Sequence, residues 1–385
     1  MRRFDIIAPC HFGLEAVLKK EITDLGYDVT QVSDGRVTFA GDEEAVVRAN
    51  IFLRTAERVM IKVCEFKAMS FDELFEKTKA VRWHDYIPAD GSFWVKKASS
   101  VRSKLYSPSD IQRIMKKAMI ESMKNGYGRE KFEENGKNYP IRVFINKDVV
   151  TASLDTTGES LHKRGYRKLQ GAAPVAENLA AAILMLTPWK EGRILVDPFC
   201  GSGTVLIEAA MMAANIAPGM NRAFNAQDWP DLIDRKLWYE CIDEANDLIK
   251  RDVRTDIQGY DIDGEVLKAA RKNAYDAGVE DMIHFQQRPV KDLSHHNKYG
   301  FVVTNPPYGE RLEEKEALKR IYQEIGEAMK RLDTWSFYVL TAYEDAQKSI
   351  GRRADKNRKI YNGMIKTYLY SYEGPKPPKK GQMIQ

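Results

Sequence analysis

A short apolar run that ends in two prolines is the feature that most constrains how this chain can fold. Residues 300–309 read Gly-Phe-Val-Val-Thr-Asn-Pro-Pro-Tyr-Gly. The apolar run is typical of a buried strand, and the prolines end it because they have no N–H to donate to a sheet ladder. Asn305 and Tyr308 are therefore predicted at the carboxyl end of a strand, where open α/β sheets bind their ligands.

The polar groups of this turn suit the amino group of a nucleobase. The Asn305 side chain offers an amide oxygen, and the carbonyls of Pro306 and Pro307 are free to accept hydrogen bonds. Tyr308 can stack on a planar ring, so the four residues together fit a base that has been extruded from its stack. The alternative is that Asn-Pro-Pro only starts a loop, because such sequences mark turns in general.

A glycine-rich turn lies upstream, in residues 193–210. The segment passes from the apolar run Ile-Leu-Val through Asp-Pro-Phe-Cys-Gly-Ser-Gly-Thr into a run rich in alanine and leucine. This order predicts a strand, a tight turn and a helix, which is a nucleotide-binding arrangement. A P-loop is excluded because no Gly-Lys-Ser/Thr follows, and a dinucleotide fingerprint fits poorly because its third glycine is missing. Asp197, at the end of the strand, suits the ammonium of a methionine-like ligand.

A second acidic strand end follows at Asp261, after Ile-Gln-Gly-Tyr and before a helical pattern over residues 264–277. In a doubly wound sheet this carboxylate would accept hydrogen bonds from both ribose hydroxyls of a nucleoside. Its distance from the glycine turn exceeds the ~20 residues of a dinucleotide site. The alternative is that Asp261 or Asp263 only caps the next helix.

These motifs carry a family resemblance. Asp-Pro-Phe-Cys-Gly-Ser-Gly-Thr at 197–204, followed by Asn-Pro-Pro-Tyr-Gly-Glu-Arg at 305–311, resembles S-adenosylmethionine-dependent RNA guanine-N2 methyltransferases that carry a THUMP domain. The bacterial 23S ribosomal RNA branch is the most similar, and the resemblance extends upstream through residues 155–167 and 173–181. The two motifs are specific in combination, whereas Asn-Pro-Pro-Tyr alone also occurs in adenine-N6 enzymes that act on DNA.

The resemblance implies an α/β protein of several domains. We expect a C-terminal Rossmann-like class I methyltransferase sheet with a terminal antiparallel hairpin, preceded by α+β ferredoxin-like and THUMP domains. The expected boundaries are 1–60 for the ferredoxin-like segment, 61–168 for the RNA-binding THUMP domain and linker, 169–373 for the methyltransferase domain, and 374–385 for a disordered basic tail. Asn362-Gly363, between two apolar runs, independently predicts the hairpin.

The resemblance also implies the cofactor and the site. S-adenosylmethionine is expected to methylate the exocyclic N2 of a guanine in RNA, with 23S ribosomal RNA or its assembly intermediate as the partner. The four catalytic residues would be Asn305, Pro306, Pro307 and Tyr308. The cofactor-binding residues would be Asp197, Phe199, Gly201, Ser202, Gly203, Thr204, Asp261, Ile262, Asp292 and Asn305.

The sequence departs from the family at the expected adenine contact. Related enzymes often place an acidic residue after the third strand, and here Gln287-Arg288-Pro289 follows residues 282–286. Pro289 stands where the carboxylate is expected, and Asp292 is the nearest substitute. Backbone groups or Gln287 are the alternatives.

Clustered basic residues suggest where RNA binds. The chain has 60 Lys and Arg against 55 Asp and Glu, and the net charge of +5 neither demands nor excludes a nucleic acid. A solvated helix face would equally explain Lys116 and Lys117. The predicted RNA contacts are Arg102, Lys104, Lys116, Lys117, Arg164, Arg167 and Lys168.

Other classes of function find less support in the sequence. The four cysteines have no paired spacing, so no metal site is expected, and Cys200 is better explained as a small buried thiol than as a nucleophile. No apolar stretch approaches the ~18 residues of a membrane span, and the N-terminus has no signal-peptide core, so we expect a cytoplasmic protein with no membrane partner. A transfer RNA guanine-N2 methyltransferase, a DNA adenine-N6 methyltransferase and a non-catalytic RNA-binding protein remain as alternatives.

Overall fold

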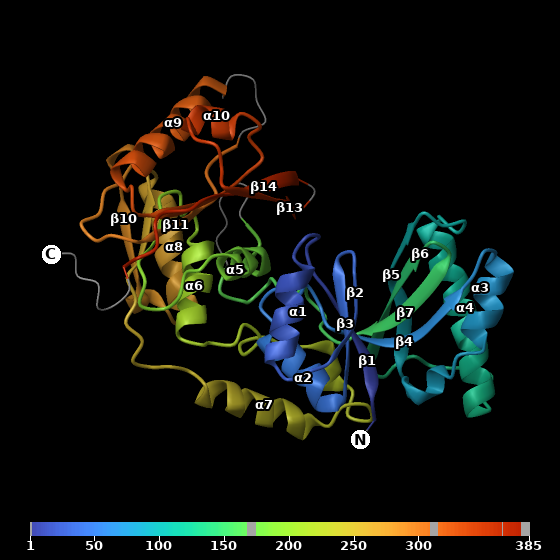
Figure 1. The fold of residues 1–385 in the computed structure, drawn as a ribbon. Helices are drawn as coiled ribbons and strands as arrows, with labels where there is room; N and C mark the ends of the chain where they lie inside the picture. Colours follow the sequence, from blue (N-terminus) through green and yellow to red (C-terminus); the bar gives the residue numbers. More distant parts are fainter. Residues whose placement is uncertain (1, 168–174, 309–314, 364, 379–385) are drawn as a thin grey trace. The chain divides into compact units, whose positions relative to one another are not determined.

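The computed structural model describes residues 2–167, 175–308, 315–363 and 365–378 (Figure 1). Contacts group the chain into two compact units, each built from separate stretches. The N-terminal unit comprises residues 1–10, 19–161 and 222–244, and the C-terminal unit comprises residues 11–18, 162–221 and 245–385. Lys168, Gly309-Glu310-Arg311 and residues 379–385 of the predicted tail lie outside the described residues.

The N-terminal unit is built on a seven-stranded sheet in the order β2-β3-β1-β4-β7-β6-β5. Its pairs are antiparallel except for β5 and β6, which run parallel. Its strands are β1 (Phe4–Pro9), β2 (Val29–Ser33), β3 (Arg36–Gly41), β4 (Met60–Lys67), β5 (Ser92–Val101), β6 (Asn138–Asn146) and β7 (Val149–Asp155). The helices of this unit are α2 (Glu43–Phe52), α3 (Phe71–Lys79), α4 (Pro108–Tyr127) and α7 (Arg235–Asp247). Helix α1 (Glu15–Asp24) is divided between the units after Leu18.

Local signals explain the ends of α4, the longest helix of this unit. The Ser107 hydroxyl accepts a hydrogen bond from the backbone N–H of Asp110, and Pro108 occupies the first turn, where it loses no helical hydrogen bond. Gly128 ends the helix in the left-handed conformation with φ of 62°, which costs glycine little. The helix therefore begins and ends where its sequence dictates.

The C-terminal unit contains a second seven-stranded sheet, in the order β10-β9-β8-β11-β12-β14-β13. The first five strands are parallel, and β14 and β13 close the sheet with antiparallel pairs. Its strands are β8 (Leu195–Asp197), β9 (Ile257–Asp261), β10 (Ile283–Gln287), β11 (Phe301–Thr304), β12 (Ser336–Thr341), β13 (Lys356–Asn362) and β14 (Ile365–Tyr372). Its helices are α5 (Glu177–Leu186), α6 (Thr204–Ala213), α8 (Gly264–Asp276), α9 (Lys315–Arg331) and α10 (Ala346–Ile350).

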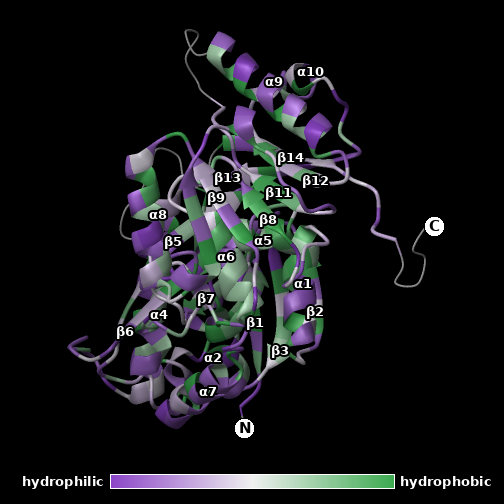
Figure 2. Ribbon diagram, turned by 90° about the vertical axis from the view of Figure 1, so that its left-hand side faces the viewer, coloured by the Kyte–Doolittle hydropathy of each residue, from purple (hydrophilic) through white to green (hydrophobic). Residues whose placement is uncertain are grey.

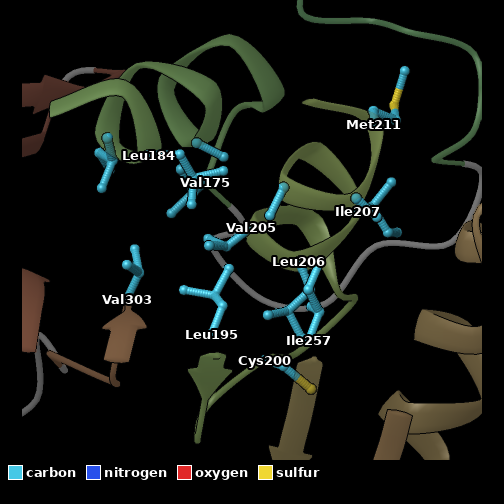
Figure 3. Packing of buried hydrophobic residues seen from close by; sticks show 14 of the residues in the cluster. Val175, Leu184, Leu195, Cys200, Val205, Leu206, Ile207, Met211, Ile257 and Val303 are labelled. Carbon is cyan, nitrogen blue, oxygen red and sulfur yellow. The ribbon is translucent and has the colours of Figure 1, made fainter. Parts of the chain in front are cut away.

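Alternating side chains of these strands form two apolar layers, one on each face of the sheet. Leu195 and Val303 pack with α5, α6 and α8, whereas their neighbours Val196 and Val302 pack with α9 and α10. Figure 3 shows the first layer, in which side chains of α6 lie over the strands. In Figure 2 the central strands β8 and β11 carry the hydrophobic colour, as expected for strands covered on both faces.

The chain order of the strands creates a ligand site at one edge of this sheet. From β8 the chain builds β9 and β10 on one side, and it then returns to place β11 and β12 on the other. The carboxyl ends of β8 and β11 therefore meet at a switch point, which is where open α/β sheets bind ligands. Asp197 ends β8, and Asn305 follows β11.

The predicted fold class is confirmed, including the hairpin of β13 and β14 around Gly363. The sequence did not predict that residues 11–18 belong to the C-terminal unit, whose core holds Leu14 and Val17. Nor did it predict that residues 222–244 belong to the N-terminal unit. In the part of the chain that the structure describes, no helix has both the length and the apolar character to cross a membrane.

Candidate active site

A cavity of about 690 Å³ opens at the carboxyl ends of β8, β9 and β11. We divide it into two ends by the sequence motifs whose residues line it. The first, which we call the cofactor end, is lined by Val175, Asp197, Phe199, Cys200, Gly201, Ser202, Thr204, Val205, Asp261, Ile262, Asp263, Pro289 and Val290. The second, which we call the acceptor end, is lined by Asn305, Pro306, Pro307, Tyr308, Ile321, Glu324 and Ile365.

Asp197 places a buried carboxylate at the cofactor end. One of its oxygens accepts hydrogen bonds from the Thr304 hydroxyl at 2.6 Å and from the Phe199 N–H at 3.1 Å. Burial raises the pKa of this carboxyl to about 7, although both hydrogen bonds oppose the shift. A bound cation would favour the ionised form of the Asp197 carboxyl. An ionised carboxylate is the partner that an ammonium group needs. The bond to Thr304 also joins the two motifs directly.

The glycine turn follows Asp197 and leads into α6. Gly201 and Gly203 have φ of 51° and 83°, in the left-handed region that favours glycine. A Cβ on Gly203 would lie 3.2 Å from the Phe285 ring, which is tighter than ordinary van der Waals contact, so packing also favours glycine there. The neighbouring Cys200 thiol is buried, which raises its pKa well above the ordinary value. The raised pKa favours the interpretation of Cys200 as a small packing residue over that of a nucleophile.

Asp261, at the end of β9, is hydrogen-bonded to the glycine turn. Its carboxylate accepts hydrogen bonds from the N–H groups of Gly201 and Asp263, both at 3.0 Å. The helix cap is Asp263, whose side chain accepts from Glu265 N–H at 2.8 Å. Asp263, and not Asp261, therefore caps the helix. Asp261 lines the cavity, and its carboxylate can accept further hydrogen bonds from ribose hydroxyls.

Apolar residues line the cavity beyond the ends of β9 and β10. Ile262 lines the cavity with 70% of its surface exposed, and Pro289 and Val290 line the cavity as well. The Gln287 side chain donates to the Ile262 carbonyl at 2.8 Å, which fixes the backbone beside the exposed isoleucine. Asp292 is exposed and does not line the cavity. The geometry favours an apolar slot over Asp292, whose role in binding stays a prediction.

The acceptor end presents hydrogen-bonding groups that the described protein leaves without partners. The Asn305 side-chain oxygen and the Tyr308 hydroxyl are buried, and neither finds a hydrogen-bond partner among the described residues. An unpaired buried acceptor costs about 1–3 kcal/mol, and Asn305 lines the cavity, so a ligand that donates to this oxygen would remove that cost. The Pro307 carbonyl accepts from the Tyr322 hydroxyl at 3.2 Å, which leaves Pro306 as the carbonyl with an open acceptor role.

The pKa of Asp197 predicts how cofactor binding depends on pH. The pKa is raised, so the free protein holds a neutral carboxyl below pH 7 and an anion above it. Because an ammonium ligand needs the anion, affinity should fall about tenfold for each pH unit below 7, with proton release on binding. Calorimetry between pH 5.5 and 7.5, in buffers that differ in ionisation enthalpy, measures both effects. Asp197→Asn should bind weakly at every pH, and an unchanged pH profile in that variant would contradict the assignment.

The basic residues predicted to bind RNA fall into two groups. In the first, the cation already has an internal partner: Arg164 pairs with the buried Glu208 at 3.4 Å, and Arg167 pairs with the buried Glu177 at 3.0 Å. Lys116 likewise pairs with Glu134 at 2.7 Å. In this structure these three cations form ion pairs within the protein. RNA contacts by them stay a prediction.

The second group lies on the surface of the N-terminal unit. Arg102, Lys104 and Lys117 are exposed, and Tyr106 beside them is 82% exposed. Asp148 fixes this loop, because its carboxylate accepts from Lys104 N–H at 2.7 Å. Exposed cations around an aromatic ring suit a nucleic-acid backbone with an unpaired base.

The sequence missed several cavity residues because they come from distant segments. Ile321, Glu324 and Ile365 line the acceptor end, and helical or strand periodicity alone gave no sign of this. The hydrogen bond from Thr304 to Asp197 was also missed. The position of Thr304 directly before Asn305 could have indicated it. Within the described ranges, no three His, Cys, Asp or Glu side chains form a group that could hold a metal ion.

Comparison with known proteins places this site in a family. Residues 164–371 match the RMKL-like methyltransferase domain, residues 5–60 match the RlmL ferredoxin-like domain, and residues 68–155 match the THUMP domain. YpsC of Bacillus subtilis (strain 168), whose name describes it provisionally as an RNA methyltransferase, is 46% identical over 99% of this chain and 98% of its own. The ribosomal RNA large subunit methyltransferase K/L of Cellvibrio japonicus (strain Ueda107) is 34% identical over 95% of this chain, which spans only 50% of that protein.

Solved structures agree with this placement and identify the cofactor. SMU.472, described provisionally as a methyltransferase, was crystallised in complex with SAH; it is 42% identical over 98% of this chain and all of its own, with a TM-score of 0.92. A protein of Listeria monocytogenes (strain 4b F2365), described as a predicted N6-adenine-specific DNA methylase, is 47% identical over 97% of both chains, also with a TM-score of 0.92. The cavity has the acidic strand ends and glycine turn that this cofactor needs. The chain therefore belongs to the RMKL-like methyltransferase family, in its THUMP-containing form, and uses S-adenosylmethionine.

Proposed function

We propose that this protein methylates the exocyclic N2 of a guanine in RNA, with 23S ribosomal RNA as the substrate. The observation that carries the proposal is the buried, unpartnered Asn305 oxygen at the acceptor end of the cofactor cavity. An oxygen in this position suits an N–H donor such as a base amine. The THUMP domain and the names of YpsC and of the K/L methyltransferases support RNA, and the K/L names support the large ribosomal subunit.

The chain's own residues would activate the amine by hydrogen bonding. S-adenosylmethionine supplies an activated methyl group when it is bound. A guanine amino group is a poor nucleophile because its lone pair is delocalised into the ring, and two acceptors that take its hydrogens favour a more pyramidal nitrogen. We assign these acceptors to the Asn305 side chain and the Pro306 carbonyl, and stacking on the base to Tyr308. The amine loses its proton after transfer, so no strong base is required.

Nucleoside analysis tests the proposal. RNA from a strain that lacks the gene should lose one N2-methylguanosine, and primer extension or fragment mass mapping should locate it in 23S ribosomal RNA. Purified protein with labelled cofactor should restore the methyl group on that RNA. If the methyl group is lost from transfer RNA instead, the protein is a transfer RNA guanine-N2 methyltransferase.

A DNA adenine-N6 methyltransferase is the second candidate. The Asn-Pro-Pro-Tyr turn is compatible with it, and the Listeria relative is described in that way. Duplex DNA with an unmethylated adenine would then be a better acceptor than ribosomal RNA.

The exposed basic loop predicts a salt effect on RNA binding. Replacing both Arg102 and Lys104 by alanine should lower the slope of log affinity against log salt concentration by about 1 to 2, because each phosphate contact releases a counterion. Filter binding of a 23S ribosomal RNA transcript across a salt series measures this slope. Lys116→Ala should leave the slope unchanged, because Glu134 already neutralises that lysine. Equal slopes for the double variant and the parent would show that Arg102 and Lys104 do not contact RNA phosphates.

A further inference from the structure

Helix α9 turns one narrow face toward the acceptor end of the cavity. Ile321 and Glu324, which are three residues apart and therefore neighbours on a helix surface, line the cavity. Leu318, Tyr322 and Ile325 instead pack into the core of the unit. Glu324 is consequently the one described α9 residue that brings a charge to this cavity.

A hydrogen bond fixes α9 against the amine-binding turn. The buried Tyr322 hydroxyl donates to the Pro307 carbonyl at 3.2 Å, and it is also hydrogen-bonded to the Thr341 hydroxyl. The Tyr322 ring packs on Tyr343, with ring centroids 4.8 Å apart. The bond to Pro307 fixes α9 beside the turn, and Ile321 and Glu324 of the same helix line the cavity together with Asn305.

The carboxylate of Glu324 is available to a ligand. Glu327 of the same helix differs from it, because Glu327 pairs with Lys330 at 2.7 Å on the exposed side of the helix. Among the described residues, no hydrogen bond or ion pair engages the side-chain carboxylate of the half-buried Glu324. The acceptor end thus offers a carboxylate together with the Asn305 oxygen and the Pro306 carbonyl, and three acceptors suit a base edge with adjacent donors.

We propose that Glu324 selects guanine by accepting the hydrogen of its N1 while the Asn305 and Pro306 oxygens accept the hydrogens of N2. Guanine presents these donors side by side on its Watson–Crick edge. Adenine places an acceptor nitrogen beside its amine, so a carboxylate would repel it. Ile321 and Ile365 would pack against the faces or rim of the same base. This inference rests on the proposed guanine-N2 activity and adds the residue that distinguishes guanine from adenine.

The base analogue 2-aminopurine tests the role of Glu324, because it keeps the 2-amino group but has no hydrogen on N1. The mapped target segment is made with guanine or 2-aminopurine at the methylated position, and single-turnover rates are measured for both. The parent enzyme should prefer guanine by about 10- to 100-fold, the usual worth of a hydrogen bond to a charged group. Glu324→Gln should lose most of this preference, because a glutamine amide can donate to the unprotonated N1. The absent O6 of the analogue affects parent and variant alike, so the change in ratio isolates N1.

Two controls separate selection from folding and from the proposed function. Glu327→Gln, on the exposed side of the same helix, should keep the parent's preference, and Glu324→Gln should keep the parent's cofactor affinity by calorimetry. An unchanged preference in Glu324→Gln, with guanine N2 still methylated, overturns this inference alone. A methyl group found on another base or atom overturns the proposed function instead.

Discussion

Asn305→Ala is expected to lower methyl transfer by about 10² to 10³ and to leave cofactor affinity nearly unchanged. The size follows from the loss of one preorganised polar group aimed at the reacting atom. The Asn305 oxygen is buried and has no partner among the described residues, so its removal disrupts no described hydrogen bond of the protein. The effect should therefore appear in the chemical step and not in folding.

Single-turnover methylation of the mapped RNA with tritiated cofactor measures the effect, and calorimetry measures cofactor affinity. Tyr308→Phe is the mild comparison, because it keeps the stacking ring, whereas Tyr308→Ala should weaken base capture by about 1–3 kcal/mol. If Asn305→Ala keeps the parent's rate, the Asn-Pro-Pro-Tyr turn is structural and the proposed mechanism is wrong.

Arg164→Ala is expected to destabilise the C-terminal unit by about 3–5 kcal/mol, because it leaves the buried Glu208 carboxylate without its cation. The guanidinium and the carboxylate have exposed side-chain fractions of 1% and 0%, and the Tyr166 hydroxyl donates to the same carboxylate at 3.0 Å. Glu208 lies on α6, the helix that follows the glycine turn. Loss of this ion pair should therefore also lower cofactor affinity.

Urea unfolding followed by circular dichroism measures the free energy of unfolding. Arg164→Met combined with Glu208→Leu should recover much of the stability, because it removes both charges and keeps apolar volume. A variant Arg164→Ala that unfolds like the parent but binds RNA with a lower salt slope would contradict this structural role and support the prediction that Arg164 contacts phosphate.

The sequence by itself determined the chemistry of the cavity to a large extent. Short-range rules placed Asp197, Asp261 and Asn305 at strand ends, because apolar runs, glycines and prolines fix where strands stop. The same rules predicted the terminal hairpin around Gly363, since its turn signal lies within a few residues. The predicted fold class and the cofactor are both shown.

Only the tertiary structure decided which side chains meet. Basic clusters in the sequence made Arg164 and Arg167 resemble RNA contacts, yet each meets a carboxylate from another segment and is held inside the protein. Glu324 reaches the acceptor end because α9 is fixed to Pro307, a contact that no local pattern encodes. Residues 11–18 likewise complete the core of the C-terminal unit from the opposite end of the chain. Local propensity sets where an element begins and ends, but partners distant in sequence are chosen by burial and charge pairing in the assembled fold.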